Sequence, residues 1–243
     1  MDIDPGYRHR PAFTEHLGKH RQYWRDMILG VNDGLVSMFL LVAGVVGGGM
    51  ATRNVLLTGV AGAIAGAVSM AAGEYMATKS QDEVFQGEIN LERQHIRDFR
   101  EDELHELRDL LKGLGLKGDL REEVVQHFNG NDDALLGVMT ALEFGVLDSE
   151  RRSAYAAAGM SGGLFLLGSA PAVIPFALVT SPHAGMVIAG IGAVLGLLIV
   201  GVIKTWATRG KPLRAAIENL LVAGVGGVLA YWVGFGFDKI VNG

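Results

Sequence analysis

The stretch SAYAAAGMSGGLFLLGSAPAVIPFALVTSPHAGMVIAGIGAVLGLLIVGVI (residues 153–203) decides the fold class of this chain. Its 51 residues include no Asp, Glu, Lys or Arg. One membrane-spanning helix needs roughly 20 apolar residues, so a stretch of this length predicts two spans. Pro182, in the polar break TSPH, marks the turn between them. We therefore expect an integral membrane protein.

Apolar segments of the same kind recur along the whole chain, in which 49% of the 243 residues are hydrophobic and 35 are glycine. Membrane helices use glycine where their backbones approach each other, and pairs such as Gly44 and Gly48 have the required spacing. The breaks MATRN and TRGKP separate further helices. The sequence therefore predicts an all-α integral membrane protein with five transmembrane helices, at about residues 26–49, 54–78, 153–179, 183–207 and 213–237.

Basic residues are divided unequally between the two sides that these five spans create. The N-terminal tail (residues 1–25), residues 79–152 and the last connection hold 5, 10 and 4 Lys or Arg, whereas the opposite side holds only Arg53 and Lys239. Loops rich in Lys and Arg stay in the cytoplasm. We therefore expect a cytoplasmic N-terminus and a C-terminus outside.

An acidic segment separates the second span from the third. Residues 80–150 hold 18 of the 26 acidic side chains, against 7 Lys or Arg. Apolar positions follow a helical period over residues 80–113, and turn residues separate two shorter helices, at about 119–128 and 132–147. This pattern predicts a three-helix soluble insert between transmembrane helices 1–2 (residues 26–79) and 3–5 (residues 151–243). The chain has no cysteine, which excludes disulfides and thiolate metal sites.

Four side chains in the first two spans are candidates for a cation path. Asp26 and Asp33 lie two turns apart on nearly the same face of the first span. A carboxylate inside a bilayer is costly and by default indicates an ion pathway, although Asp26 is also explained as a charge at a helix start. Met70 and Glu74 are one turn apart in the second span, where methionine usually only packs. A thioether beside a carboxylate suits a borderline divalent ion.

The insert carries a second candidate site. Glu92, His95, Glu103 and Glu106 fall on one helical stripe, and the third insert helix offers Met139 and Glu143 one turn apart. Carboxylates and an imidazole can hold a hard or borderline cation. The alternative is a solvated face whose charge is neutralised by interspersed arginines (Arg93, Arg97, Arg100 and Arg108).

Two span motifs, LGVNDGLVSMFLLVAGVVGG (residues 29–48) and AGAVSMAAGEYMATKSQ (residues 65–81), resemble the vacuolar iron transporter family when they are followed by such an insert. The resemblance extends from about Trp24 to the end of the chain. It implies a homodimer that exports Fe²⁺, often also Mn²⁺, by proton antiport along the first two helices of both subunits. It also implies that Asp26, Asp33 and Met70 line the path.

The same resemblance implies metal ligands in the cytoplasmic insert, namely Glu92, Glu103, Glu106, Met139 and Glu143. His95 stands where the family has Glu, and Thr140 where a second Met is expected. A neutral imidazole still binds Fe²⁺, Mn²⁺ or Zn²⁺, so the departure predicts altered selectivity and a lower affinity at acid pH.

We therefore expect a secondary transporter for metal homeostasis rather than an enzyme, without a prosthetic group. Its expected partners are divalent metal ions, protons, membrane lipid and a second copy of the chain, and not nucleic acid. The short N-terminal tail favours a bacterial inner membrane over a vacuolar one. Two alternatives stay open: a membrane-anchored, ferritin-like ferroxidase, and a metal sensor without flux.

Overall fold

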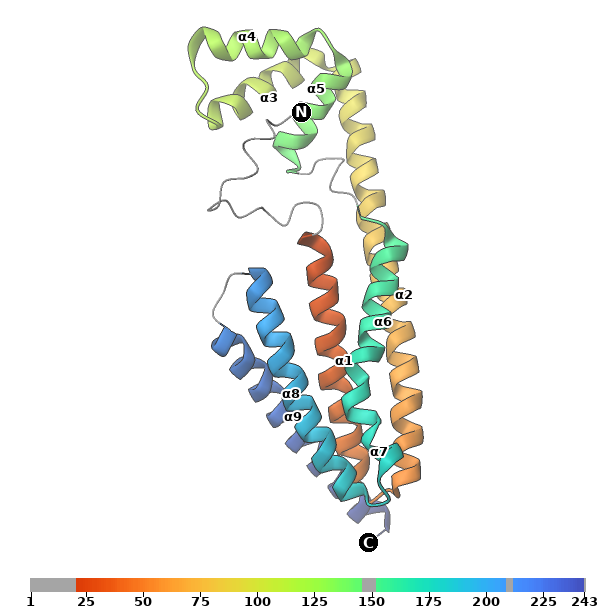
Figure 1. Cartoon of the computed structure of the whole chain (residues 1–243). Coiled ribbons are helices and arrows are strands. Elements are labelled where there is room, and N and C mark those ends of the chain that lie inside the picture. Colours follow the sequence, from red (N-terminus) through yellow and green to blue (C-terminus); the bar gives the residue numbers. More distant parts are fainter. Residues whose placement is uncertain (1–20, 146–151, 209–211, 243) are drawn as a thin grey trace, which may run out of the picture. The chain divides into compact units, whose positions relative to one another are not determined.

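Every secondary-structure element in the described part of the chain, residues 21–145, 152–208 and 212–242 of the computed structural model, is a helix. Among these elements, five are long and apolar enough to cross a membrane (Figure 1). They are α1 (Arg21–Gly47), α2 (Thr52–Asp98), α6 (Ala154–Val173), α8 (Pro182–Thr208) and α9 (Pro212–Asn242). Each contains the greater part of one predicted span, which confirms the expected class of all-helical membrane protein.

The chain forms two compact units, of which the first combines the described residues of Met1–Val60 and Leu167–Gly243. Here α1 crosses α9 at very short range. A methyl group on Gly234 of α9 would overlap the carbonyl oxygen of Gly44, and one on Gly47 would overlap that of Tyr231. Only glycine permits such a backbone approach, and in lipid this packing replaces the hydrophobic drive that joins helices in water.

The third predicted span is shorter than expected. Residues 153–179 were expected to form one helix, but α6 ends at Val173 and the short α7 (Pro175–Leu178) follows. Pro175 has no N–H to donate, and it begins α7 at a position where proline is tolerated. The backbone then becomes extended at Val179, which lies before the turn to α8.

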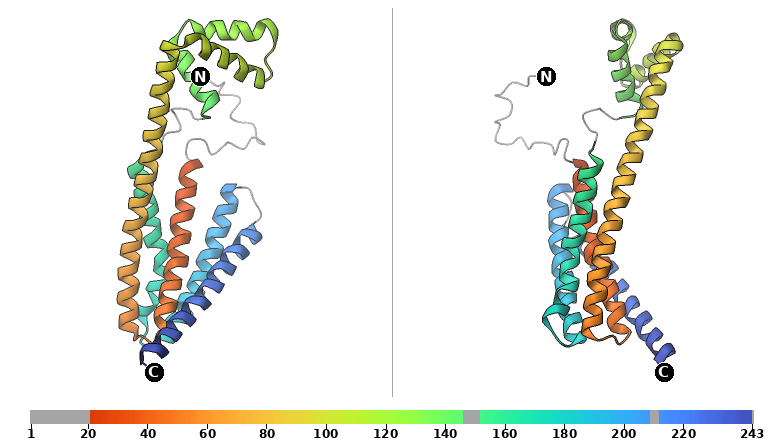
Figure 2. Two further views of the ribbon diagram at one scale, coloured as in Figure 1. Left: turned by 180° about the vertical axis from the view of Figure 1, so that it is seen from behind. Right: turned by 90° about the vertical axis from the view of Figure 1, so that its right-hand side faces the viewer.

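The second unit, Ala61–Leu166, contains most of α2. At 1.5 Å per residue, the 47 residues of α2 extend about 70 Å, more than twice the ~30 Å hydrocarbon core of a bilayer (Figure 2). The end of α2 that includes Glu92 therefore lies outside the membrane-spanning segment. The prediction of one separate helix over residues 80–113 is wrong, because α2 runs on to Asp98 and ends where Phe99 leaves helical geometry (φ −132°, ψ 39°).

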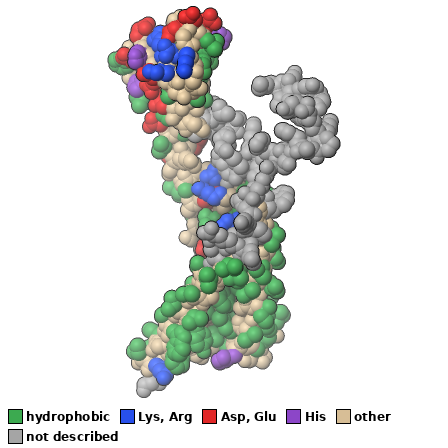
Figure 3. Space-filling model, turned by 90° about the vertical axis from the view of Figure 1, so that its left-hand side faces the viewer, with side chains coloured by type: hydrophobic (Ala, Val, Ile, Leu, Met, Phe, Trp, Pro, Cys, Tyr) green, Lys and Arg blue, Asp and Glu red, His purple; other side chains and the backbone are tan. Residues whose placement is uncertain are grey.

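Three short helices follow this break: α3 (Arg100–Gly113), α4 (Gly118–Asn129) and α5 (Asp132–Glu143). With the end of α2 they enclose an apolar core formed by Ile96, Leu104, Leu107, Leu111, Val125, Leu135 and Met139. The turn after α3 needs Gly115, whose φ of 95° disfavours other residues. Arg100 bonds the turn between α4 and α5, because its guanidinium lies 2.6 Å from Asp132 and 2.7 Å from Asn129. Charged side chains gather over these helices, whereas apolar ones cover the membrane helices (Figure 3).

Candidate metal and transport sites

The end of α2 and the start of α3 bring Glu92, His95 and Glu103 together. One ligand atom from each lies within 4.8 Å of the other two. Ligand atoms that share one ion at about 2.1 Å lie about 3 to 4 Å apart, so this spacing is close to what a single metal requires. His95 Nδ1 is 3.3 Å from Glu103 Oε1. The break at Phe99 makes this possible, because it turns α3 back towards the last turns of α2.

Both carboxylates of this triad are buried without enough partners. Glu92 is 4% exposed and Glu103 is 5% exposed. Among the described residues, Glu92 Oε1 and Glu103 Oε2 have no hydrogen-bond partner. Burial, together with repulsion from Glu103, raises the pKa of Glu92 to about 8. A buried oxygen left in this state destabilises the fold unless a ligand satisfies it, so the triad has the properties of a cation site.

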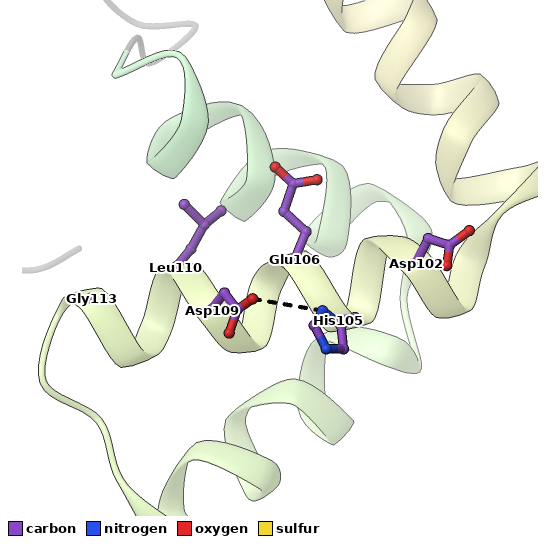
Figure 4. Close-up of a pocket in the computed structure, with 6 residues that line it drawn as sticks. All are labelled: Asp102, His105, Glu106, Asp109, Leu110 and Gly113. Carbon is purple, nitrogen blue, oxygen red and sulfur yellow. Dashed lines mark ion pairs between the residues drawn. The ribbon is translucent and has the colours of Figure 1, made fainter.

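More carboxylates surround the triad. Glu143 on α5 has a raised pKa because of burial and of repulsion from Glu106, Glu103 and Glu88. Glu106 is exposed and lies on α3, with its carboxylate directed away from His105 and Asp109, which pair with each other at 3.7 Å (Figure 4). The predicted ligands Glu92, His95, Glu103, Glu106 and Glu143 thus share one electrostatic environment. Glu88, one turn before Glu92, is a member that we did not predict from the sequence.

The predicted ligand Met139 occupies a different environment. Its side chain is fully buried in the apolar core of the insert. Thr140, also buried, donates its hydroxyl to the Leu136 carbonyl at 2.6 Å. In this structure Met139 therefore packs against leucines, and a role as a ligand stays a prediction.

The arginines of the stripe do not neutralise these carboxylates. Among the described residues, Arg93 bonds Asn90, and Arg97 bonds its neighbour Asp98. The other two point to later helices: Arg100 pairs with Asp132, and Arg108 with Glu122 at 2.9 Å. The alternative of a self-neutralised solvated face therefore does not describe the triad.

In the first unit, the two predicted path carboxylates of α1 have different surroundings. Asp26 is fully buried, with Oδ1 at 3.2 Å from Arg25 Nε. Asp33 is half-buried, and its backbone carbonyl accepts a hydrogen bond from the Ser37 hydroxyl. Beside it, Asn32 Oδ1 is buried and has no hydrogen-bond partner in the described part of the chain. These polar groups in a membrane helix are costly, which is typical of a functional position.

The two predicted path residues of α2 belong to the second unit. Met70 is half-buried, whereas Glu74 is 8% exposed. Glu74 Oε1 lies 3.5 Å from Nη2 of Arg152. After Glu88, Arg152 is the second residue near a candidate site that we did not predict from the sequence. Arg152 precedes α6, and no local pattern relates it to a residue 78 positions earlier.

The sequence comparisons agree with these features. The profile of the VIT family matches residues 24–235. The chain belongs to this family. It is 30% identical over 238 residues to vacuolar iron transporter 2 of Oryza sativa subsp. japonica, covering 97% of this chain and 95% of the relative. Vacuolar iron transporter 1 of Arabidopsis thaliana is 31% identical, with 95% and 93% covered, and that of Tulipa gesneriana 29%, with 89% of each.

Family membership confirms the resemblance stated from the span motifs, and it makes the chain a member of a transporter family. This membership supports an integral membrane protein that transports metal ions. Of the two residues missed, Glu88 could have been found by extending the stripe one turn towards the N-terminus. Arg152 could not, since only the packing of α6 against α2 brings it to Glu74.

Proposed function

We propose that this protein exports Fe²⁺, and also Mn²⁺, from the cytoplasm in exchange for protons. The observation that carries the proposal is the pair of buried carboxylates of Glu92 and Glu103 beside the His95 imidazole, each with one oxygen that has no hydrogen-bond partner among the described residues. The names of the relatives, which are iron transporters, support iron as the cargo. The insert would collect the ion on the cytoplasmic side, which its excess of acidic residues favours.

Within the membrane, Asp26, Asp33, Met70 and Glu74 would replace part of the ion's hydration shell. A divalent ion in a bilayer needs compensating negative charge, and Asp33 supplies a carboxylate without a described basic partner. Protonation of the same carboxylates from the outer side would release the metal, so exchange needs no separate proton site.

The topology and assembly form part of the proposal. Positive loops favour a cytoplasmic N-terminus and an outer C-terminus. A homodimer follows from the family resemblance. The relatives, which are named for the vacuole, do not support the expected bacterial membrane.

Uptake of Fe²⁺ into proteoliposomes, with and without an imposed pH gradient, tests the function. Wild type should take up metal in proportion to the gradient, and Asp33→Asn should lose nearly all of this uptake. Asp119→Asn, which removes an exposed carboxylate of α4, is the matched control and should behave as wild type. Full gradient-driven uptake by Asp33→Asn would remove Asp33 from the path.

Folded wild type that moves neither Fe²⁺, Mn²⁺ nor Zn²⁺ would contradict the transport proposal. Oxygen consumption with Fe²⁺, at two metals per insert, would then indicate the ferroxidase. Metal-dependent association of the insert without flux would indicate the sensor.

A further inference from the structure

A buried ion pair joins α2 to the residue that precedes α6. Arg152 Nη2 lies 3.5 Å from Glu74 Oε1, and each of the two side chains is 8% exposed. Thr78 completes the cluster, since its hydroxyl oxygen is 3.3 Å from both of these atoms. The guanidinium therefore has at least two buried oxygen partners at the cytoplasmic end of the second predicted span.

The contacts below this cluster already hold the two helices together. A methyl group on Gly162 of α6 would overlap Ala67 and Ala71 of α2, and Phe165 packs on Gly66 in the same way. The rings of Tyr75 and Tyr155 lie 5.2 Å apart. Small residues and aromatic rings therefore also hold α2 against α6, so the contact of the two helices does not rest on the ion pair alone.

The position of Glu74 makes its pairing consequential. It stands one turn after Met70 on the same face of α2, and both residues are proposed ligands on the path. Arginine keeps its charge at every physiological pH, so its guanidinium stays a competitor for the Glu74 oxygens. A metal ion and a guanidinium repel each other, so a guanidinium that stays on the Glu74 carboxylate weakens metal binding there.

We infer that Arg152 is a resident counter-ion of Glu74, which a divalent cation must displace in order to use that carboxylate during transport. The inference rests on the proposed function and names a determinant of its selectivity. The Arg152 guanidinium is itself a monovalent cation, and its attachment to the chain keeps it at a high local concentration beside Glu74. Na⁺ or K⁺ therefore gains nothing by replacing it. A divalent ion carries twice the charge and does gain, which makes Arg152 a positioning residue that selects for divalent ions.

Transport kinetics test the inference. Arg152→Gln should lower the apparent KM for Mn²⁺ about tenfold, the scale of one close charge–charge interaction, and should make uptake sensitive to Na⁺. Arg152→Lys keeps the charge and should retain the wild-type KM. Arg93→Gln is the matched control, because Arg93 is an exposed arginine that, within the described residues, bonds Asn90 alone.

A binding measurement separates this inference from the proposed function. Mn²⁺ titration of the full chain in detergent, with Glu92→Gln and Glu103→Gln present to silence the insert, needs no flux. Adding Arg152→Gln should strengthen the remaining Mn²⁺ binding about tenfold, and adding Glu74→Gln as well should abolish that gain. Wild type that moves no metal would refute transport, whereas this titration would still decide on Arg152.

A purely structural role predicts a different result. In that case Arg152→Gln lowers the melting temperature while the KM and the Mn²⁺ affinity stay unchanged, and the exchange Glu74→Arg with Arg152→Glu restores the melting temperature. This outcome would overturn the inference. If Arg152→Gln does not fold, Thr78→Val removes one partner of the guanidinium and keeps its charge; it should lower the KM about threefold, and an unchanged KM would again refute the inference.

Discussion

Glu74 and Glu92 are the same residue type in the same helix, with opposite surroundings. They lie 18 residues apart in α2, which is five full turns, so they occupy the same face. Both are buried, at 8% and 4% exposure. Glu74 meets the guanidinium of Arg152, whereas Glu92 meets a second carboxylate, that of Glu103.

The difference shows that burial alone does not give a carboxylate its role. A buried charge that has an opposite partner is compensated, and removal of that partner is strongly destabilising. A buried carboxylate beside another one keeps its proton or binds a cation. The partner comes from a different part of the chain in each case, the residue Arg152 before α6 for Glu74 and α3 for Glu92, so tertiary packing assigns the two roles.

The largest expected effect comes from removing the negative charges of Glu92 and Glu103 together. Glu92→Gln with Glu103→Gln should weaken Mn²⁺ binding to the insert about hundredfold, because two charged ligands of one ion are lost. Glu74→Gln and the exposed control Glu101→Gln should leave that affinity within about twofold. Calorimetric titration of the full chain in detergent measures it. Unchanged binding in the double variant would contradict the contrast between Glu74 and Glu92, since Glu92 would then bind no metal.

A second prediction concerns pH. The pKa of Glu92 is raised to about 8, so at neutral pH the metal must displace a proton from it. Mn²⁺ affinity should therefore rise about tenfold per pH unit between about pH 6 and 7.5 and level off above about pH 8. The same titrations at several pH values check this. A flat profile would mean that Glu92 is already ionised in the metal-free protein.

The imidazole of the triad should affect selectivity more modestly. His95→Glu should reduce the ratio of Zn²⁺ to Mn²⁺ affinity about fivefold, because nitrogen ligands favour zinc and carboxylates favour manganese. His105→Glu, on the exposed side of α3, is the matched control. Competition between the two ions for the detergent-solubilised protein measures the ratio. An unaltered ratio would exclude His95 from the ligand set.

The smallest effect is on the stability of the metal-free insert. Between the ordinary pKa of 4.5 and the raised value of about 8, folded Glu92 holds a proton that the unfolded chain lacks. Stability is therefore greatest below about pH 4.5 on account of this group, falls as pH rises, and is constant above about pH 8. Circular dichroism should record a melting temperature a few degrees lower at the upper end. Glu92→Gln should remove this dependence, while Glu101→Gln should keep it.

Much of the fold could be predicted from the sequence because a bilayer imposes strict conditions on it. A span must be long, apolar and helical, and residues 153–203 meet these conditions without any knowledge of their neighbours. The predicted boundaries fail where a local signal is weak. No proline or glycine marks the break at Phe99 in the sequence. The break arises because Ile96 and Leu104 must enter one core.

The candidate site, too, could be predicted from the sequence only in part. Helical spacing placed Glu92, His95, Glu103 and Glu106 on one stripe, and the structure brings the first three of them together through a turn between two helices. A continuous helix would have separated Glu92 from Glu103 by about 16 Å along its axis. Three of the predicted residues therefore do come together, but they meet because α3 folds back on α2 and not because they share one helical face.

The sequence by itself determined the membrane class, the number of spans and the set of acidic side chains, because hydropathy and charge are local properties. Only the tertiary structure decided which carboxylates are compensated. Arg152 reaches Glu74 because small residues let α6 lie against α2, and Glu103 reaches Glu92 because α3 folds back on the last turns of α2. Electrostatic partnership depends on distance in space, and the order of residues along the chain does not contain that distance.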